Sequence, residues 1–292
     1  MKDFVKNMAD SKTVTANGLD LKCYFDGLGN EGAAVVLLHG AGADSAMLSW
    51  KEVVPLLAGK GFRVIAPDLP GYGGSARFSG DYSLGFYAET IKALIGALGL
   101  GPVVLCGLSL GGGIALTAAL ESPELLKAII PVDAWGLFEK LPNHRLTHWF
   151  VNSRINKGLY RWTGKSKGII RWSLEANLIS DKSKVTDALV GEVLTAMRQP
   201  DAGEPFRSFQ MCEITRDGLA TPIFGRLGEI ALPTLLVHGS RDKAVPLCGA
   251  VAAQKLMPNA RLHIMEGCKH WPQKERPEEF VAAVSGFLGE LD

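Results

Sequence analysis

Five apolar runs, each closed by a glycine or an aspartate, constrain the fold of this chain more than any other feature. They occupy residues 33–40, 62–68, 102–107, 127–133 and 233–239, and a weaker sixth run covers 260–266. Continuous apolar runs of this length are typical of strands that are buried on both faces of a parallel sheet. Apolar residues at helical spacing lie between the runs, as in 86–98 and 280–287. This alternation predicts a parallel α/β sheet flanked by helices.

The start of the chain and one break in the pattern set the domain organisation. Two short alternating runs flank Asn17-Gly18, a dipeptide that favours a β-hairpin before the first buried strand. After the sixth strand the alternation stops for a long segment, where tryptophans, charges and helical patches replace the apolar runs. We therefore predict an α/β core of residues 1–133 and 227–292, with a mainly helical cap at 134–226 inserted after the sixth strand.

Size and charge exclude several classes of function. The chain has 292 residues, 47% of them apolar, so it can bury a large core. Its formal net charge is only +1, which gives no electrostatic reason to expect nucleic acid as a partner. No apolar stretch reaches the roughly 20 residues of a membrane span, so stable membrane insertion is not expected.

The first residues and the cysteines favour a cytoplasmic protein. The opening segment, MKDFVKNMAD, has no apolar centre, so no signal peptide is expected. The cysteines are scattered along the chain, and none are paired at metal-ligand spacing. They are Cys23, Cys106, Cys212, Cys248 and Cys268. We expect reduced, mostly buried thiols.

A serine stands on the corner that follows the third buried run. The stretch Gly107-Leu108-Ser109-Leu110-Gly111 follows an apolar strand and precedes two more glycines and small helix formers. A G-x-S-x-G match between a strand and a helix is typical of a nucleophilic serine. Small neighbours let the backbone turn sharply, and the helix directs its N-terminal N–H groups to the same place. We predict that Ser109 is a nucleophile.

His270 is the best candidate for the base that a serine nucleophile needs. It lies in a loop after the last strand and before the last helix, at the edge of a parallel sheet that the serine also occupies. The remaining histidines lie at strand ends, in the cap or within a strand, where structural roles suffice. They are His39, His238, His144, His148 and His263.

The histidine needs an acid that fixes its tautomer, and two aspartates beyond strands qualify. Asp242 follows the run at 233–239, and Asp133 ends the run before the cap. The order serine, aspartate, histidine favours Asp242, because folds with this serine turn use that order. A catalytic part for Asp133 stays open. The structural alternative is that Asp133 only ends a strand or caps a helix.

Small residues after the first buried run predict the second half of an oxyanion hole. The stretch His39-Gly40-Ala41-Gly42 lets the backbone approach a substrate closely. We predict that the N–H groups of Ala41 and Leu110 hold the oxyanion.

Taken together, these segments resemble the α/β-hydrolase fold family. HGAG, DLPGYGGS, GLSLGG, HGSRDKAVP and GCKHWP stand in that family's order and spacing, and the resemblance covers most of the chain outside 134–226. It implies a central, mostly parallel sheet of about eight strands and a Ser-His-Asp site. It implies no particular substrate, because the cap is where such families diverge.

A serine, a base, an acid and an oxyanion hole indicate acyl transfer to water through an acyl-enzyme, with no metal or organic cofactor. We expect a small-molecule substrate, a carboxylic ester of a small to medium acyl compound. The alternative is hydrolysis of a carbon–carbon bond in a vinylogous diketone, as in capped relatives, although HGAGADSAMLSW lacks the proline usual in their oxyanion loop. The family's dehalogenases and epoxide hydrolases use aspartate as nucleophile, which argues against both. A cyanohydrin-cleaving lyase and a receptor that retains the triad stay open.

One segment of the cap is strongly basic. Residues 140–171 hold eight basic side chains and no Asp or Glu, and five aromatics lie within or beside the segment. The basic residues are Lys140, Arg145, Arg154, Lys157, Arg161, Lys165, Lys167 and Arg171, and the aromatics are Trp149, Phe150, Tyr160, Trp162 and Trp172. The plainer interpretation is a solvated basic face whose aromatics pack on the core. The other is a positive collar over the site, which would steer anionic substrates or an acidic carrier.

Overall fold

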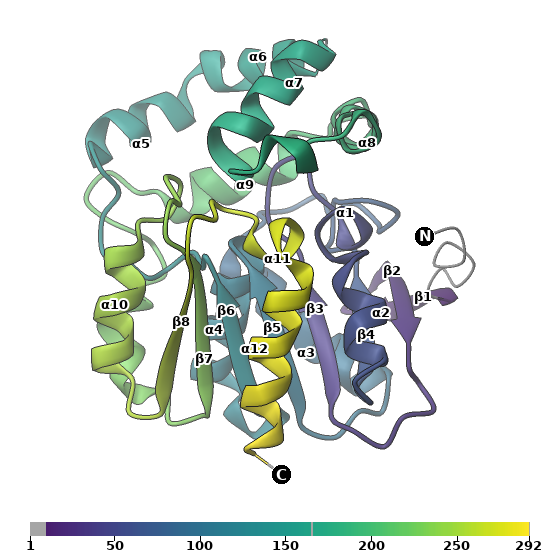
Figure 1. The fold of residues 1–292 in the computed structure, drawn as a ribbon. Coiled ribbons are helices and arrows are strands. Elements are labelled where there is room, and N and C mark those ends of the chain that lie inside the picture. The colour runs from purple at the N-terminus through teal and green to yellow at the C-terminus, as the bar shows by residue number, and fades with distance from the viewer. Residues whose placement is uncertain (1–9, 165, 292) are drawn as a thin grey trace.

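One eight-stranded sheet forms the centre of the molecule. The structure is a computed structural model, and it describes residues 10–164 and 166–291 without the side chains of 157 and 159–162. The strand order is β1-β2-β4-β3-β5-β6-β7-β8 (Figure 1). Strands β3 to β8 run parallel, whereas β1 and β2 form a hairpin and β2 pairs antiparallel with β4. The strands are β1 (Asp10–Ala16), β2 (Leu19–Asp26), β3 (Ala34–Leu38), β4 (Arg63–Pro67), β5 (Val103–Leu108), β6 (Leu126–Val132), β7 (Thr234–Gly239) and β8 (Ala260–Met265). The predicted mostly parallel sheet is confirmed.

Alternate side chains of the central strands pack into two cores, one on each face of the sheet. All six residues of β5 are buried. Val103 and Leu105 join one core, and Val104 and Cys106 join the other. A strand that buries both faces has no position for a polar side chain, which is why these strands are continuous apolar runs in the sequence.

Helices cover both faces of the sheet (Figure 1). Three helices, α3 (Leu84–Ala97), α4 (Leu110–Glu121) and α10 (Leu247–Leu256), pack into the first core. The second core receives α1 (Ala46–Trp50), α2 (Val53–Ala58) and α12 (Pro277–Gly289), and the short α11 (Pro272–Glu275) precedes α12. Each parallel strand is therefore buried between two helical layers, as the alternation of the sequence predicts.

The chain between β6 and β7 is mainly helical and lies over one edge of the sheet (Figure 1). It contains α5 (His144–Asn152), α6 (Arg154–Thr163), α7 (Lys167–Ser173), a π-helical turn (Leu174–Leu178), α8 (Asp187–Met197) and α9 (Glu204–Glu213). Among the described residues of this segment, the only β pairing is an isolated bridge between Ile214 and Leu219. The predicted helical insertion after the sixth strand is confirmed. No helix among the described residues is long and apolar enough to cross a membrane.

Polar contacts hold this helical segment on the core. The Glu275 carboxylate accepts the N–H groups of Ser180 and Asp181 at 2.9 and 2.8 Å. On the other side of the segment, the Leu84 N–H donates to the Glu213 carboxylate at 3.0 Å. Both carboxylates belong to buried residues. The segment is therefore fixed at its two sides over the edge of the sheet that carries the loops after β5, β7 and β8.

Candidate active site

Ser109 joins β5 to α4 in a backbone conformation that is uncommon for a residue with a side chain. Its φ is 52° and its ψ is −109°. The Ser109 N–H donates to the Val132 carbonyl at 2.8 Å, and its carbonyl accepts the Trp135 N–H at 2.9 Å. Positive φ at a non-glycine residue stores strain, and such strain is concentrated at functional sites. Both hydrogen bonds keep Ser109 on the wall of a cavity under the helical segment.

The glycines two residues before and after Ser109 are required by the packing of the turn. A Cβ atom on Gly107 would lie 2.1 Å from the Gly111 carbonyl oxygen. A Cβ atom on Gly111 would lie 2.4 Å from the Leu38 carbonyl oxygen on β3. Backbone groups cannot move away as side chains can, so neither position accepts a larger residue. The spacing G-x-S-x-G is thus a consequence of how sharply the chain turns here.

His270 and Asp242 lie together at the same edge of the sheet. His270 is in the loop between β8 and α11, and Asp242 follows β7. His270 Nδ1 is 2.7 Å from Asp242 Oδ2, and Asp242 Oδ1 accepts the N–H groups of Ala244 at 2.7 Å and Val245 at 3.2 Å. A carboxylate only accepts hydrogen bonds, so Nδ1 carries the proton of neutral His270 and Nε2 is left as an acceptor. His270 lines the same cavity as Ser109.

Asp242 is held in its ionised form although it is buried. Burial opposes ionisation more than any other single influence, but the hydrogen bond and charge of His270, with the N–H groups of Val245 and Ala244, outweigh it. The pKa of Asp242 therefore lies below its ordinary value. The negative charge stabilises a protonated His270, which is what general-base catalysis requires of such a partner.

Asp133 lies beside this pair without contacting the imidazole ring of His270 as Asp242 does. Its Oδ1 accepts the Gly239 N–H at 3.0 Å, and its Oδ2 has no hydrogen-bond partner among the described residues. Burial, followed by the negative charge of Asp242, raises the pKa of Asp133 well above its ordinary value. The folded protein therefore favours the neutral form of Asp133 and the ionised form of Asp242.

Asp133, Asp242 and His270 also form the one cluster of three metal-type ligands found among the described residues, with one ligand atom of each within 4.8 Å of the others. The hydrogen bond from His270 Nδ1 to Asp242 already occupies two of these atoms. Burial and the charge of Asp242 raise the pKa of Asp133, which disfavours a second ionised carboxylate in the cluster. The contact between Asp242 and His270 is thus explained by their hydrogen bond, and Asp133 lies beside it.

His39 and His238 shape turns, as the sequence indicates. His39 Nε2 accepts the Leu69 N–H at 2.9 Å, and its Nδ1 donates to the Gly40 carbonyl at 2.7 Å. His238 Nε2 donates to the Val245 carbonyl at 2.8 Å, and burial lowers its pKa. Both rings are buried and hydrogen-bonded to the backbone, so neither can serve as a base for a substrate.

Ala41 lines the cavity beside Ser109, and Leu110 begins α4. The N–H of a first helical residue has no partner within its helix, so that of Leu110 is left for another acceptor. The Asp44 carboxylate accepts the Gly40 N–H at 2.8 Å and the Ser49 hydroxyl at 2.7 Å, which fixes the loop that carries Ala41. That these two N–H groups hold an oxyanion stays a prediction.

The cavity at Ser109 has a volume of about 270 Å³ and mostly apolar walls. Its described lining is Gly40, Ala41, Gly42, Ala43, Ser109, Thr163, Ile169, Ile170, Ser173, Leu174, Leu178, Val193, Met197, His270 and Trp271. Helices α7 and α8 provide the aliphatic wall opposite Ser109. The sequence does not identify the lining residues on these two helices, because apolar positions on an amphipathic helix do not reveal whether they face a core or a cavity. Among the described lining residues, His270 alone can carry a charge.

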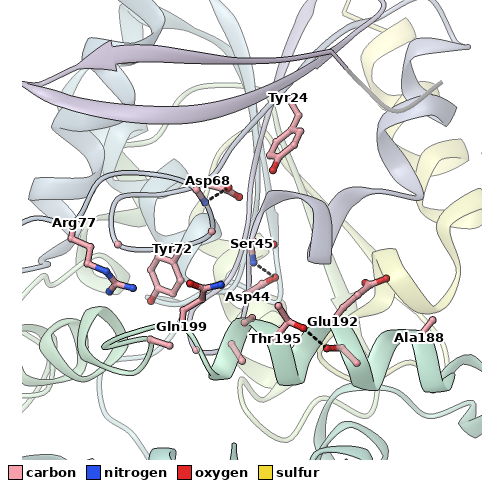
Figure 2. Close-up of a pocket in the computed structure, with 18 residues that line it drawn as sticks. Tyr24, Asp44, Ser45, Asp68, Tyr72, Arg77, Ala188, Glu192, Thr195 and Gln199 are labelled. Atoms are coloured by element: carbon pink, nitrogen blue, oxygen red, sulfur yellow. Dashed lines mark hydrogen bonds between the residues drawn. The ribbon is translucent and has the colours of Figure 1, made fainter. Parts of the chain in front are cut away.

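A second and larger cavity, of about 630 Å³, lies between α8 and the loops after β3 and β4. Figure 2 shows Glu192 and Thr195 on α8, and Gln199 just after it, facing Asp44 and Tyr72 on the core side. It shares only Gly42 and Ala43 with the cavity at Ser109, and its described lining includes neither Ser109 nor His270. The loop that carries Ala41 therefore separates an apolar cavity from one whose lining includes the charged residues Asp44, Asp68, Arg77 and Glu192.

The basic segment of the insertion points mainly to solvent. Lys140, Arg145, Arg154 and Lys167 are exposed, and Arg171 is paired with Asp187 at 2.7 Å. The side chains of Lys157, Arg161 and Lys165, and of Tyr160 and Trp162, lie outside the described part of the chain. No described basic residue lines the cavity at Ser109, so its lining lends no support to the expectation of an anionic substrate. The expectation that the aromatics pack on the core is wrong for Trp149 and Trp172, which are exposed.

Comparison with known proteins places this geometry in a family context. A family model described as the alpha/beta hydrolase fold matches residues 33–277. The chain is 32% identical to a 2-hydroxy-6-oxo-6-phenylhexa-2,4-dienoate hydrolase of Burkholderia cepacia, with 95% of this chain and 96% of that one covered. It is 30% identical to a 2-hydroxymuconate semialdehyde hydrolase of a Pseudomonas species, over 89% of this chain and 88% of the other.

Solved structures of similar shape have more diverse names. A meta-cleavage product hydrolase from Pseudomonas fluorescens superposes with a TM-score of 0.80 at 28% identity, covering 96% of this chain and 98% of that one. A putative lipase from Acinetobacter baumannii superposes with a TM-score of 0.82 at 24% identity, over 97% of this chain and 92% of the other. At that lower identity the likeness concerns the fold alone.

Proposed function

Because the chain belongs to the α/β-hydrolase fold family, we propose that it is a serine hydrolase of esters with a small to medium, uncharged acyl group. In this proposal Ser109 is the nucleophile, His270 the base and Asp242 the acid. The N–H groups of Ala41 and Leu110 form the oxyanion hole. The observation that carries the proposal is the apolar cavity on which Ser109 and His270 both lie.

The described walls of the cavity favour an uncharged acyl group. A carboxylate that is moved from water into an apolar site costs several kcal/mol unless a cation or several hydrogen-bond donors receive it. The aliphatic wall of Ile169, Ile170, Val193 and Met197 offers neither. The cavity at Ser109 has a volume of about 270 Å³. This volume lies just below the range of about 300–1,000 Å³ that is usual for ligand pockets, which favours a short or medium acyl chain.

Each residue has a defined part in the proposed mechanism. The Ser109 hydroxyl attacks the ester carbonyl while His270 Nε2 takes its proton, and the negative oxygen is held by the two N–H groups of the oxyanion hole. His270 then passes the proton to the departing alcohol. Water, activated by the same nitrogen, attacks the acyl-enzyme and releases the acid. Asp242 keeps His270 in the tautomer that leaves Nε2 free and stabilises the imidazolium.

A second candidate function is hydrolysis of a carbon–carbon bond in a vinylogous diketone. It is favoured by the names of relatives that are 28–32% identical, such as the dienoate hydrolases of Burkholderia cepacia and Pseudomonas putida. In the 2-hydroxy-6-oxo-6-phenylhexa-2,4-dienoate named for the Burkholderia relative, the carboxylate is on the part that leaves and the acyl part is an uncharged benzoyl group, so the apolar cavity at Ser109 suits the acyl part of this candidate too. The two candidates share the nucleophile and the base, so they differ in substrate and not in machinery.

One panel of substrates distinguishes the candidates. The purified protein is assayed with p-nitrophenyl butyrate, with p-nitrophenyl hemisuccinate as its anionic counterpart of similar length, and with 2-hydroxy-6-oxo-6-phenylhexa-2,4-dienoate. We expect kcat/KM for butyrate to exceed that for hemisuccinate by at least tenfold and the dienoate to be turned over slowly. Ser109→Ala serves as the control for spontaneous hydrolysis. A dienoate that is cleaved faster than every ester would replace the proposal by the second candidate.

A further inference from the structure

We propose that the outward faces of α5, α6 and α7 bind the surface of an anionic lipid bilayer. This cap face is defined by the apolar residues Leu146, Trp149, Ile155 and Trp172 and by the basic residues Arg145, Arg154 and Lys167. Binding to the bilayer depends on the residues of this cap face alone. Only the consequence for the substrate rests on the proposed function.

Large exposed apolar side chains are concentrated on these three helices. Leu146 is 62% exposed, Trp149 58%, Ile155 58% and Trp172 67%. Only three other large apolar side chains are exposed among the described residues, and they are scattered over the rest of the chain. Single exposed apolar residues are ordinary, but a group of them indicates a surface that contacts another apolar phase. Leu146 and Trp149 lie one turn apart, so they share one side of α5.

The charge of the same face selects an anionic partner. Arg145 precedes Leu146 on α5, Arg154 precedes Ile155 on α6, and Lys167 begins α7; all three are exposed. Residues 140–174 contain no Asp or Glu, although the net charge of the whole chain is only +1. Tryptophan beside Lys and Arg on amphipathic helices is the composition of segments that lie in the interface of anionic membranes.

The position of the face makes contact with a flat surface possible. Helices α5, α6 and α7 lie along the rim of the molecule farthest from the sheet (Figure 1). One helix connects this face with the site, since Ile169 and Ile170 of α7 line the cavity at Ser109 while Lys167 and Trp172 are exposed. If the proposed function holds, a bilayer on this face would lie one helix away from the acyl cavity, and the substrates would be acyl compounds that partition into lipid.

Flotation with lipid vesicles tests the proposal. The chain is mixed with vesicles of phosphatidylcholine, with or without phosphatidylglycerol, at about 0.01 M and 0.15 M salt, between which the Debye length falls from about 30 Å to about 8 Å. We expect binding to the anionic vesicles alone, weaker at the higher salt. The double variant Trp149→Ser/Trp172→Ser and the triple variant Arg145→Glu/Arg154→Glu/Lys167→Glu should each bind at least tenfold more weakly.

Matched variants away from the cap face serve as controls. Leu28→Ser/Leu256→Ser removes exposed apolar side chains outside the helical insertion. Lys12→Glu/Lys60→Glu/Lys243→Glu reverses exposed charges that also lie outside it. Both should bind vesicles like the unaltered chain, and circular dichroism checks that every variant is folded.

Three results would overturn the proposal: no binding by the unaltered chain, an equal loss in the control variants, or a loss of self-association in the cap variants without any vesicle binding. Because flotation needs no catalysis, Ser109→Ala is floated as well. Vesicle binding by the unaltered chain without any ester hydrolysis would refute the proposed function alone.

Discussion

Replacement of Asp133 by asparagine tests how the two buried carboxyl groups divide their roles. Burial and the charge of Asp242 raise the pKa of Asp133 well above its ordinary value, so the folded protein favours the neutral form of this side chain. Asparagine has nearly the same shape and is neutral at every pH. Its amide oxygen still accepts the Gly239 N–H, which Asp133 Oδ1 accepts at 3.0 Å. We therefore expect Asp133→Asn to change kcat/KM for p-nitrophenyl butyrate by less than about threefold, about 0.7 kcal/mol.

Asp242→Asn is the matched comparison, because it removes the charge that His270 Nδ1 contacts at 2.7 Å. An amide can also donate to Nδ1, which stabilises the wrong tautomer and leaves Nε2 protonated. Such a change costs roughly 10⁴-fold in turnover, which corresponds to about 5.5 kcal/mol. The two asparagine variants should thus differ in kcat/KM by about three orders of magnitude or more.

Stability as a function of pH provides an independent measure of the same assignment. Asp133 binds a proton more tightly in the folded state, so its contribution to stability is present below the unfolded pKa of about 3.9 and is lost as pH rises toward the folded pKa. The loss amounts to at most about 1.4 kcal/mol per pH unit. Asp133→Asn lacks this titration, so its free energy of unfolding relative to the unaltered chain should increase from pH 5 to pH 8.

Urea unfolding at several pH values and kcat/KM for both variants complete this test. A loss of 10³-fold or more in Asp133→Asn, with a mild effect of Asp242→Asn, would make Asp133 the catalytic acid. A stability difference that does not change with pH would show that Asp133 is not held neutral.

Further substitutions test the turn, the cavity and the buried ion pair. Gly111→Ala puts a Cβ atom 2.4 Å from the Leu38 carbonyl oxygen and should lower the free energy of unfolding by about 2–3 kcal/mol, measured with urea. Val193→Phe narrows the acyl cavity, so kcat/KM should fall at least tenfold for p-nitrophenyl octanoate and little for the acetate. Glu52→Gln removes the carboxylate that lies 3.0 Å from the buried Lys274 ammonium. Because Glu52 is about a third exposed, we expect the free energy of unfolding, measured with heat or urea, to fall by about 1–2 kcal/mol.

Most of the sheet could be predicted from the sequence because its strands are buried on both faces. The runs at 102–107 and 233–239 coincide with β5 and β7 to within one residue at each end. The turn at Ser109 was predictable for a related reason, since backbone groups approach Gly107 and Gly111 too closely for any side chain. In both cases a local sequence pattern is forced by a local geometric requirement.

The helical insertion was predictable only in outline. Helical spacing shows that an apolar stripe exists, but the surface that covers it comes from another part of the chain. Ile170 and Val193 face the cavity at Ser109, whereas Trp149 and Trp172 face solvent, and nothing in their spacing distinguishes the two outcomes. The pairing of His270 with Asp242 instead of Asp133 likewise depends on how two loops meet, which chain order favours without fixing the contact.

Covalent labelling tests most directly whether Ser109 is the nucleophile of an acyl transfer. Diethyl p-nitrophenyl phosphate phosphorylates an activated serine hydroxyl and releases nitrophenolate, and peptide mapping by mass spectrometry locates the adduct. We predict one adduct per chain, on Ser109, with esterase activity lost in proportion to labelling. Ser109→Ala should take up no label and lose at least 10³-fold in kcat/KM for p-nitrophenyl butyrate. A folded Ser109→Ala protein that hydrolyses this ester at close to the unaltered rate, or an adduct on another residue, would show that Ser109 is not the nucleophile.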